Sequence, residues 1–424
     1  MALIVHKYGG TSMGSTERIR NVAKRVAKWA RAGHQMVVVP SAMSGETNRL
    51  LALAKELSPA QQGKAHAREL DMLAATGEQA SSALLAIALQ AEGLEAVSYT
   101  GWQVPIRTND AYTKARIESI DDARIRADLA QGRVVIVTGF QGVDGDGHIT
   151  TLGRGGSDTT AVAIAAALAV QRDGGCCEIY TDVDGVHTAD PRLVPDAPKL
   201  GTITYDEMLE LAAMGAGVMH ARAVVFGQRH GVPIHVRHSQ RPEPGTMIQR
   251  ETPHMESIAV IGCALKTDLG RVHLQGLPRT AGVQGQVFSA IASRGLIVDD
   301  IIQTEGANAV DLAFTVEHGD LPEVKTAVGE VLQQLGSGRI DLEIGLAKVS
   351  AVGTGMRSHA GVASRMFQVL GDAGVPIRNI TTSEIRISCL VPQEHGERSL
   401  RLVHEAFGLA LGERVTLQRQ LGTV

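Results

Sequence analysis

The sequence has little that would place the chain in a membrane or an oxidising compartment. No apolar run approaches the roughly 18 residues that a membrane-spanning helix needs. Residues 2–5 are apolar, but Lys7 follows almost at once, so the start has no signal-peptide pattern. The four cysteines, at positions 176, 177, 263 and 389, form neither a CxxC pair nor a metal-ligand spacing. We therefore expect a cytoplasmic protein with reduced thiols, no membrane partner and no metal-binding motif.

Long runs of one charge are also missing. The chain has 41 basic and 45 acidic residues and a net charge of -4, which gives no reason to expect nucleic acid as a partner. Aromatic residues make up only 3% of the sequence, whereas glycine occurs 47 times. This composition favours an α/β enzyme over a β-sandwich, and 424 residues predict about two or three domains.

A glycine-rich stretch, residues 150–160, lies between two apolar segments. Residues 134–140 upstream predict a buried strand, and residues 161–170 downstream predict a helix packed against a sheet. Ser157 or Asp158 is the expected N-cap of that helix. The pattern therefore predicts a strand, a glycine-rich turn and a helix in succession.

Arg154 stands among three glycines, at positions 153, 155 and 156. Glycines allow a close approach of the backbone to a ligand, and the start of a helix favours anions. The planar guanidinium of Arg154 would then face a carboxylate or a phosphate. The alternative is an ordinary turn with a solvated arginine, because short motifs have many false positives.

Two successive β-α units open the chain. Residues 3–5 predict a strand, and a loop with lysine, two glycines, threonine and serine follows it at 7–12 before a helix at 18–32. Residues 36–39 predict a second strand, followed by the hydroxyl-rich loop 41–48. Both layouts suit ligand binding at the carboxyl ends of the strands, although a capped helix start is the alternative for each. The first loop is not a Walker A motif, because its lysine precedes the glycines.

Acidic residues mark two further places. Glu78 could bind an ammonium group or be a surface glutamate, and its spacing does not decide between the two. The loop 181–192, after a predicted strand at 178–180, contains three aspartates that could reach Mg²⁺ or a ribose. Aspartate-rich loops near glycine and proline are more often turns, and EF-hand spacing is absent.

Five of these segments occur in an order that resembles one family. The segments are 7–12, 41–48, 77–78, 151–158 and 180–186, and together they are similar to the aspartate kinases of the amino-acid kinase family, over residues 1 to about 240. The resemblance implies a three-layer αβα fold for residues 1–245. It also implies transfer of phosphate from ATP, with Mg²⁺, to L-aspartate, which gives 4-phospho-L-aspartate in the first step of lysine, threonine and methionine biosynthesis. Another amino-acid kinase acting on a different acid is the alternative.

The same resemblance implies roles for individual residues. Lys7 and Asp158 would be catalytic, with Lys7 facing the charge on the transferring phosphoryl group and Asp158 orienting Lys7 or a Mg²⁺-bound water. A carboxylate acceptor is already ionised at pH 7, so the reaction needs no general base. Arg154 would bind the α-carboxylate of aspartate and Glu78 its ammonium group. The implied aspartate-binding residues are Ser41, Thr47, Glu78, Arg154, Gly155 and Ser157. The implied ATP-binding residues are Lys7, Tyr8, Gly9, Gly10, Thr181, Asp182, Asp184, His187, Asp190 and Arg192.

The second half contains an internal repeat. A polar, proline-bearing linker is expected at 241–256, after a last kinase strand at 232–236. Residues 282–305 then align with 361–384, each copy reading as strand, glycine turn, helix and strand. The pattern resembles tandem ACT domains, α+β (βαββαβ) sensors of amino acids, at 266–340 and 345–424.

The ACT resemblance implies feedback control by lysine, threonine or both. The implied effector-binding residues are Gln303, Asn379, Thr381, Thr382, Ser383 and Glu384. Repeats of this kind tend to pair by their sheet edges, within a chain or in a homo-oligomer. Arg279 stands where the family usually has an aspartate and would repel the side-chain ammonium of lysine, which favours threonine. A catalytically weak amino-acid sensor is the rival from another class, and the presence of Lys7, Arg154 and Asp158 argues against it.

Overall fold

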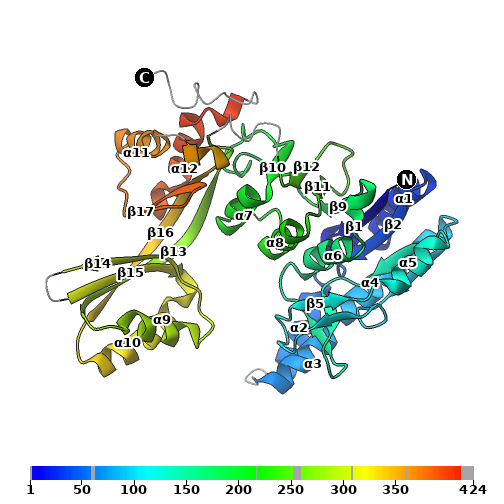
Figure 1. Ribbon diagram of the computed structural model, residues 1–424, viewed down its shortest axis with the longest axis horizontal. Helices are drawn as coiled ribbons and strands as arrows, with labels where there is room; N and C mark the ends of the chain where they lie inside the picture. Colours follow the sequence, from blue (N-terminus) through cyan, green and yellow to red (C-terminus); the bar gives the residue numbers. More distant parts are fainter. Residues whose placement is uncertain are drawn as a thin grey trace. The chain divides into compact units, whose positions relative to one another are not determined.

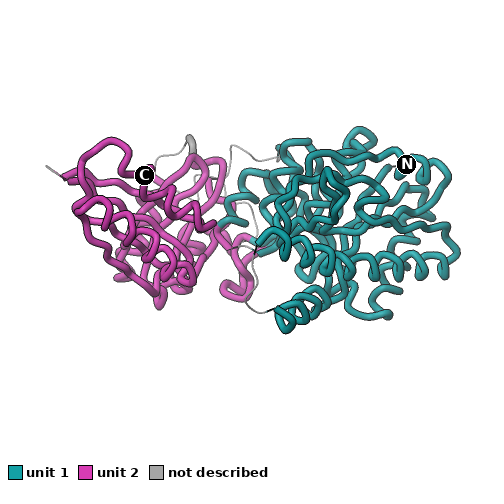
Figure 2. The backbone as a smooth tube through the Cα atoms, turned by 90° about the horizontal axis from the view of Figure 1, so that it is seen from below, with its two compact units in different colours: residues 1–187, 199–213, 217–253 teal, residues 188–198, 214–216, 254–424 magenta. Residues whose placement is uncertain are grey.

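The computed structural model describes residues 2–58, 63–215, 217–251, 259–306, 309–358 and 361–411. They form two compact units, drawn in different colours in Figure 2. The first consists of residues 1–187, 199–213 and 217–253, and the second of residues 188–198, 214–216 and 254–424. A single boundary near residue 245 therefore does not separate the units, because residues 188–198 leave the first unit and pack in the second.

An eight-stranded sheet forms the centre of the first unit (Figure 1). The strand order is β10-β12-β11-β9-β1-β2-β6-β3, and all neighbours are parallel except β11 and β12. Strands β2 and β6 are almost entirely apolar, as expected for strands covered on both faces, whereas β1 and β9 also contain the buried His6 and Glu178. The strands are β1 (Leu3–Tyr8), β2 (Gln35–Pro40), β3 (Ala96–Tyr99), β6 (Val134–Val137), β9 (Cys177–Thr181), β10 (Thr202–Thr204), β11 (Ile234–His238) and β12 (Thr246–Gln249).

Helices cover both faces of this sheet, which gives the expected three-layer arrangement. Successive residues of β1 point to opposite faces: the ring of His6 contacts Trp29 on α1 (Thr16–Arg31), whereas Lys7 reaches Asp158 on α6 (Gly156–Ala167). Helix α4 packs beside α1, and α8 beside α6. The other helices of the unit are α2 (Glu46–Leu57), α3 (Lys64–Ala74), α4 (Thr76–Ala91), α5 (Ala123–Ala130), α7 (Tyr205–Ala213) and α8 (Ala221–His230).

A smaller sheet of four strands completes the first unit, in the order β5-β4-β7-β8. Its strands are β4 (Ile106–Thr108), β5 (Ile117–Ile120), β7 (Gln141–Val143) and β8 (Ile149–Thr151). β8 leads directly into the glycine-rich turn and α6, so this sheet carries the segment that the sequence singles out.

Helices α3 and α4 follow each other almost without a break over Lys64–Ala91, and by length and composition alone this stretch could cross a membrane. Half of it is buried inside the protein. Core helices of soluble proteins have the same character, so the stretch is weak support for a membrane span.

Two local predictions for the first unit are wrong. Helix α6 begins two or three residues earlier than expected, and its N-cap is Gly155 rather than Ser157 or Asp158. The left-handed backbone of Gly155, with φ of 67°, lets the helix start there. The expected linker at 241–256 contains β12, which pairs with both β10 and β11, so the strand at 234–238 is not the last of the sheet. Residues 252–256 of that expected linker lie outside the described residues.

The second unit is built on a six-stranded antiparallel sheet in the order β14-β15-β13-β16-β18-β17. Its two long central strands, β13 and β16, pair with each other along most of their length and each serve both repeats. The expected boundaries at 266–340 and 345–424 fall inside these two continuous strands. The elements are β13 (Gly262–Pro278), α9 (Val283–Ala292), β14 (Asp299–Glu305), β15 (Ala309–Glu317), α10 (Leu321–Leu335), β16 (Arg339–Val352), α11 (Val362–Asp372), β17 (Asn379–Thr382), β18 (Arg386–Pro392) and α12 (Gly396–Ala406).

The internal repeat appears in the structure in the expected register. Gly282 and Gly361 are the N-caps of α9 and α11, and both have a left-handed backbone with φ of 94° and 109°. Gly295 and Gly374 end the corresponding turns with φ of 72° and 69°. The two copies join through β13 and β16 into one sheet, so their pairing within the chain is confirmed.

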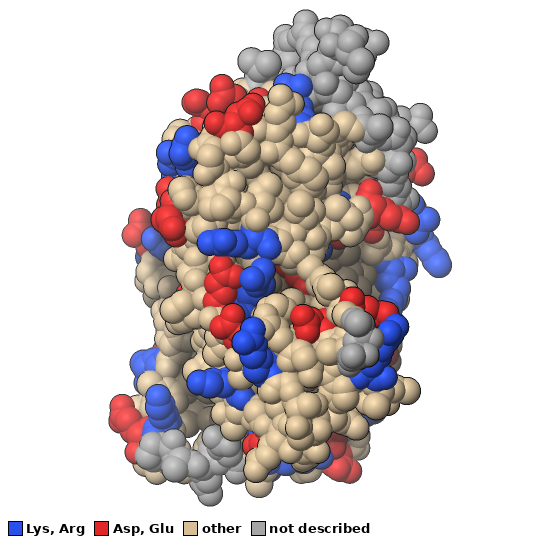
Figure 3. Space-filling view, turned by 90° about the vertical axis from the view of Figure 1, so that its left-hand side faces the viewer, with Lys and Arg blue, Asp and Glu red and all other residues tan. Residues whose placement is uncertain are grey.

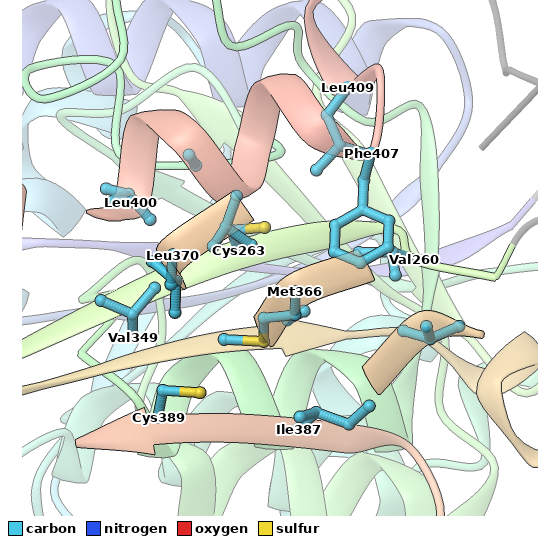
Figure 4. Packing of buried hydrophobic residues seen from close by; sticks show 14 of the residues in the cluster. Val260, Cys263, Val349, Met366, Leu370, Ile387, Cys389, Leu400, Phe407 and Leu409 are labelled. Atoms are coloured by element: carbon cyan, nitrogen blue, oxygen red, sulfur yellow. The ribbon is translucent and has the colours of Figure 1, made fainter. Parts of the chain in front are cut away.

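The core of the second copy takes in residues from the catalytic half of the chain. Figure 4 shows its centre, where Met366 and Leu370 of α11 pack among residues of β13, β16, β18 and α12. Ala189, Val194 and Ala197 belong to the same buried cluster. The side chains of Thr188 and His404 also hydrogen bond at 2.8 Å, both buried. Residues 188–198 are thus an integral part of this unit.

Candidate active site

A cavity of about 520 Å³ lies in the first unit, beside the carboxyl ends of β1, β2 and β6. Segments far apart in the sequence line it, because parallel strands end at the same edge of the sheet and their following loops meet there. The two residues predicted to be catalytic and the six predicted to bind aspartate all line this one cavity. They are Lys7, Ser41, Thr47, Glu78, Arg154, Gly155, Ser157 and Asp158.

Lys7 and Asp158 form an ion pair in this cavity. The Nζ atom of Lys7 lies 2.6 Å from Oδ1 of Asp158, and the two side chains are 11% and 13% exposed. Asp158 belongs to the first turn of α6, where the amide groups of a helix start favour a negative charge. The pair fixes the direction of the lysine ammonium group at the cavity wall.

The turn before α6 can only be made by glycine. A Cβ atom on Gly155 would lie 2.3 Å from Cβ of His220, and one on Gly153 would lie 2.9 Å from the carbonyl oxygen of Thr113. Both glycines have left-handed backbones, with φ of 67° and 77°. This tight turn brings the start of α6 to the cavity and leaves Arg154, which is exposed, at its lining.

Glu78 is a buried carboxylate with one unused oxygen. Its Oε1 accepts a hydrogen bond from the amide of Ala42 at 3.0 Å, and the residue is only 3% exposed. Its Oε2 is buried and has no hydrogen-bond partner among the described residues. Burial raises the pKa of Glu78 to about 7, against the lowering effect of the Ala42 amide. A positively charged ligand group would satisfy this oxygen.

Two residues that sequence reasoning missed hold the cavity together. Asp71 on α3 accepts hydrogen bonds from Thr113 and Thr151, and Arg222 on α8 donates to the carbonyl groups of Leu152 and Ala115. A signal for Asp71 exists in the sequence, because it occupies an i+4 position in the apolar pattern of α3 and a carboxylate on such a face needs a buried partner. No comparable pattern marks Arg222.

The first glycine-rich loop differs from its prediction. The Gly9 amide donates to the carbonyl of Tyr180 at 3.2 Å and is therefore already paired within the protein, so its use as a phosphate ligand stays a prediction. The ring of Tyr8 is fully buried and stacks on that of Tyr180, with centroids 4.8 Å apart, so its side chain is part of the core. A Cβ on Gly10 would lie 3.1 Å from the Ala42 carbonyl oxygen, which shows how closely the first two loops approach.

The residues predicted to bind ATP after β9 fall into two groups. Asp184 accepts from His187 at 2.9 Å and from Lys199 at 3.4 Å. Burial alone would raise its pKa, but these two partners lower the pKa to about 2. Thr181 donates to Asp182 at 3.0 Å. Asp190 and Arg192 instead belong to the second unit, where they pair with each other at 2.6 Å.

Comparison with known proteins shows which family the chain belongs to. Residues 2–238 match the model of the amino acid kinase family, and residues 349–407 match an ACT domain. The chain is 49% identical to an aspartate kinase of Pseudomonas fluorescens, over 96% of this chain and 98% of that one. It is 47% identical to an aspartokinase of Geobacillus stearothermophilus, over 97% and 98% of the two chains. The chain belongs to the aspartate kinase family.

Solved aspartate kinase structures share this fold. The aspartokinase III of E. coli in complex with aspartate and ADP superimposes with a TM-score of 0.80 at 27% identity, over 97% of this chain and 100% of that one. The same enzyme in complex with lysine and aspartate gives a TM-score of 0.75 at 27% identity, over 95% and 99% of the chains. The aspartate kinase fold, with its C-terminal ACT domains, is therefore confirmed for this chain.

The residues predicted to bind effectors lie on the two edge strands of the regulatory sheet of this aspartate kinase. Gln303 is on β14, where it accepts a hydrogen bond from Gln284 at 2.8 Å, and Asn379 is on β17 at the opposite edge. Thr381 and Thr382 follow on β17, and Ser383 and Glu384 come directly after it. Within one chain the two groups are separated by four strands, so they do not form one site.

Arg279 is not an isolated cation. It pairs with Glu305 of β14 at 2.8 Å, and both side chains are 56% exposed. In Figure 3 acidic and basic side chains likewise lie side by side over the face that is shown. Exposed pairs of this kind contribute little to stability, so a charged ligand could displace either partner at small cost.

Proposed function

We propose that the cavity binds L-aspartate between Glu78 and Arg154 and directs its side-chain carboxylate towards the phosphoryl group of ATP near Lys7. The observation that carries the proposal is the convergence of a fixed ammonium, an unpaired buried carboxylate oxygen and an exposed guanidinium on one cavity. These three groups complement the three charges of an α-amino dicarboxylic acid approaching a phosphate.

Recognition of aspartate would rest on opposite charges at its α-carbon. Oε2 of Glu78 would accept from the α-ammonium group, which replaces the missing partner of a buried carboxylate. Arg154 would bind the α-carboxylate with two parallel hydrogen bonds. The hydroxyl groups of Ser41, Thr47 and Ser157, which line the cavity, would position the remainder of the molecule. An N-acylated amino acid has no ammonium group for Glu78, which favours a free amino acid.

Phosphoryl transfer would depend on alignment and charge. The attacking carboxylate is ionised at neutral pH, so no side chain has to remove a proton. Lys7 would face the place where negative charge accumulates on the transferring group, and its pair with Asp158 holds the direction of its ammonium group. The start of α6 would add its amide groups to the same anionic region.

The nucleotide would be ATP with Mg²⁺. No cluster of three or more metal-binding side chains occurs in the part of the chain that the structure describes. Mg²⁺ does not need such a cluster, because this ion is usually held by substrate phosphates, waters and one or two carboxylates. Asp158 and Asp182 would supply such a carboxylate, and the bound ion would neutralise charge on the phosphates. Asp184 and His187, which belong to the first unit, would lie along the nucleotide.

Control of the enzyme would follow from the ACT domains. The neighbouring aspartokinase III was solved in complex with lysine and aspartate, which supports an amino-acid effector for this chain as well. We propose feedback by lysine, threonine or both, in the biosynthesis of lysine, threonine and methionine. The edge strands β14 and β17 present Gln303 and Asn379 to solvent-accessible sheet edges, and pairing of these edges in a homo-oligomer would bring the two groups together.

A coupled assay of ADP release tests the substrate. The purified protein should release ADP with L-aspartate, and much less with L-glutamate or N-acetyl-L-glutamate. Equal or faster release with N-acetyl-L-glutamate would overturn the pairing of Glu78 with an ammonium group. Tight binding of amino acids without any ADP release would instead favour the rival function of an amino-acid sensor.

A further inference from the structure

Two residues of the cavity lining hold a backbone conformation that their side chains disfavour. Thr113 and Phe140 have φ of 66° and 72°, in the left-handed region, and both line the cavity. Such strain persists only where the surrounding structure fixes it, and it clusters at functional sites. The backbone of Thr113 is held in this conformation by hydrogen bonds from its amide to the carboxylate of Asp71.

Asp71 accepts hydrogen bonds with both of its oxygens. The Thr113 amide donates to Oδ1 and Oδ2 at 3.0 and 2.9 Å. The Thr151 amide donates to Oδ2 at 2.8 Å, and the Thr151 hydroxyl donates to Oδ1 at 2.6 Å. Asp71 is 1% exposed. Burial raises its pKa, and the hydrogen bonds from Thr151 and Thr113 partly oppose that effect. Because protein donors occupy both oxygens, the carboxylate is not free to bind a ligand.

These bonds tie α3 to the segment that carries Arg154. Thr151 is the last residue of β8, and the turn with Arg154 begins two residues later. The carbonyl of Thr113 faces Gly153 so closely that a Cβ there would lie 2.9 Å from it. The Ala115 amide also donates to the Thr151 carbonyl at 2.9 Å. Asp71 therefore holds the two backbone segments, at Thr113 and at Thr151, that adjoin the turn.

Arg222, on α8, holds the backbone beside the same turn by hydrogen bonds. Its guanidinium donates to the carbonyl of Leu152 at 2.9 Å and to that of Ala115 at 2.7 Å. Burial lowers the pKa of Arg222. The backbone just before Arg154 is thus clamped between a buried carboxylate and a partly buried guanidinium.

We propose that Asp71 is a positioning residue for aspartate binding, which acts by holding Thr113 and Thr151 so that the turn presents Arg154 to the substrate. The inference rests on the proposed role of Arg154 in binding the α-carboxylate. The clamp leaves the Lys7 and Asp158 pair untouched, so its loss should affect the binding of aspartate and not that of ATP.

Asp71→Asn is the direct test. The amide group of asparagine would turn a donor towards the donors of Thr113 or Thr151, so one side of the clamp would open. We expect the KM for aspartate to rise by about tenfold or more. The KM for ATP should stay within about twofold. An aspartate KM close to that of the wild type would overturn the proposal.

Asp128→Asn is the matched control. Asp128, on α5, is also a buried aspartate, 5% exposed, and accepts hydrogen bonds from Tyr99 at 2.6 Å and from Arg133 at 2.8 Å. It does not line the cavity. The control should lower the thermal midpoint without changing the aspartate KM. If both variants changed the aspartate KM alike, Asp71 would have only a general structural role and the proposal would be wrong.

A double variant separates this inference from the role of Arg154. Arg154→Ala should raise the aspartate KM, and adding Asp71→Asn should then raise it little further, because both changes remove the same contact. Fully additive effects would overturn the proposed action through Arg154. An unchanged KM in Arg154→Ala alone would instead refute the binding role of Arg154, and the inference with it.

Thr151→Val keeps the test open if Asp71→Asn does not fold. This change removes only the hydroxyl that donates to Asp71 at 2.6 Å and nearly preserves the shape of the side chain. We expect a smaller rise in the aspartate KM, about threefold, with no change for ATP. An unaltered aspartate KM in a folded Thr151→Val enzyme would count against the clamp.

Discussion

Lys7 carries the charge on which the proposed transfer depends. Because Asp158 holds its ammonium at 2.6 Å, Lys7→Ala removes an oriented cation and not a mobile one. We expect turnover to fall by at least about a hundredfold, as for the loss of a transition-state donor. Aspartate binding should largely survive, since Glu78 and Arg154 carry it. Turnover should be measured beside Lys64→Ala, a control on the exposed ion pair with Asp110. Activity of Lys7→Ala within a few-fold of wild type would contradict the assigned role.

The pH dependence of aspartate use should report the state of Glu78. Burial raises the pKa of this carboxyl to about 7, so below that pH it is mostly protonated and cannot pair with an ammonium. We expect kcat/KM for aspartate to increase as the pH rises from about 6 to about 8, since this ratio follows the free enzyme. Glu78→Gln should have a low kcat/KM without this rise. A profile that is the same in both enzymes would show that another group titrates.

The sequence predicts single residues of this site better than their surroundings. Lys7, Glu78 and Arg154 stand in segments whose order and residue types are specific, and the structure places all three at one cavity. Asp71 was missed because its partners, Thr113 and Thr151, are 42 and 80 residues away along the chain. The apolar pattern of α3 marks Asp71 as a buried position, but it does not show which distant backbone groups the carboxylate binds.

At the scale of single elements, the turn between β8 and α6 depends on Gly155. Its φ of 67° disfavours any other residue, and a Cβ would lie 2.3 Å from Cβ of His220. We expect Gly155→Ala to lower both the thermal midpoint and the rate with aspartate, because the turn and Arg154 must shift. Gly145→Ala is the control, since nothing lies within 4 Å of a Cβ there.

His220 offers a check on the cause. In a Gly155→Ala, His220→Gly double variant the Cβ at 220 is absent, so the clash disappears while the left-handed strain at 155 remains. Stability should therefore recover in part. No recovery at all would mean that backbone strain alone explains the loss, and full activity of the single variant would refute the steric argument.

Helices and strands were predicted well where the apolar pattern is regular. They were predicted poorly where tertiary contacts determine whether an element forms or where it begins. The strands that became β1, β2, β6 and β9 are short apolar runs, and the structure has them all. β12 was hidden in a polar stretch with several prolines, where it is stabilised by pairing with β10 and β11 and not by its own composition. The start of α6 was misplaced because Ser157 and Asp158 resemble N-caps, whereas glycine conformation sets the true start.

At the scale of the whole molecule, the internal repeat was predictable from the sequence, but the sharing of strands between its two copies was not. The paired glycines of the two copies give their register in the sequence. Nothing in the sequence indicates that β13 and β16 each serve both copies, because strand sharing depends on pairing between residues about 75 positions apart. The same holds for residues 188–198, whose small apolar side chains give no sign that they belong to the core of the regulatory unit.

The response to effector amino acids involves the complete chain, because an effector bound to the second unit would control catalysis in the first. Arg279 precedes α9, and Glu305 ends β14 beside it, so an amino acid at this edge would meet a cation and an anion 2.8 Å apart. Its α-carboxylate can replace Glu305 on Arg279, and its α-ammonium can then pair with the freed Glu305. Lysine brings a second ammonium that must be placed near Arg279, whereas threonine brings only a hydroxyl. We therefore predict inhibition by threonine, or by lysine and threonine together, in preference to lysine alone, with a coupling of about 1–3 kcal/mol.

Inhibition of the purified full-length enzyme by lysine, by threonine and by both checks this prediction. Arg279→Asp removes the repulsion and should shift the response towards lysine. The control is Arg294→Asp, which breaks a similar surface pair with Glu330, between α9 and α10, away from the edge strand. This control should leave the preference unchanged. Micromolar inhibition by lysine alone that Arg279→Asp does not alter would refute the argument, because the charge at residue 279 would then have no part in choosing the effector.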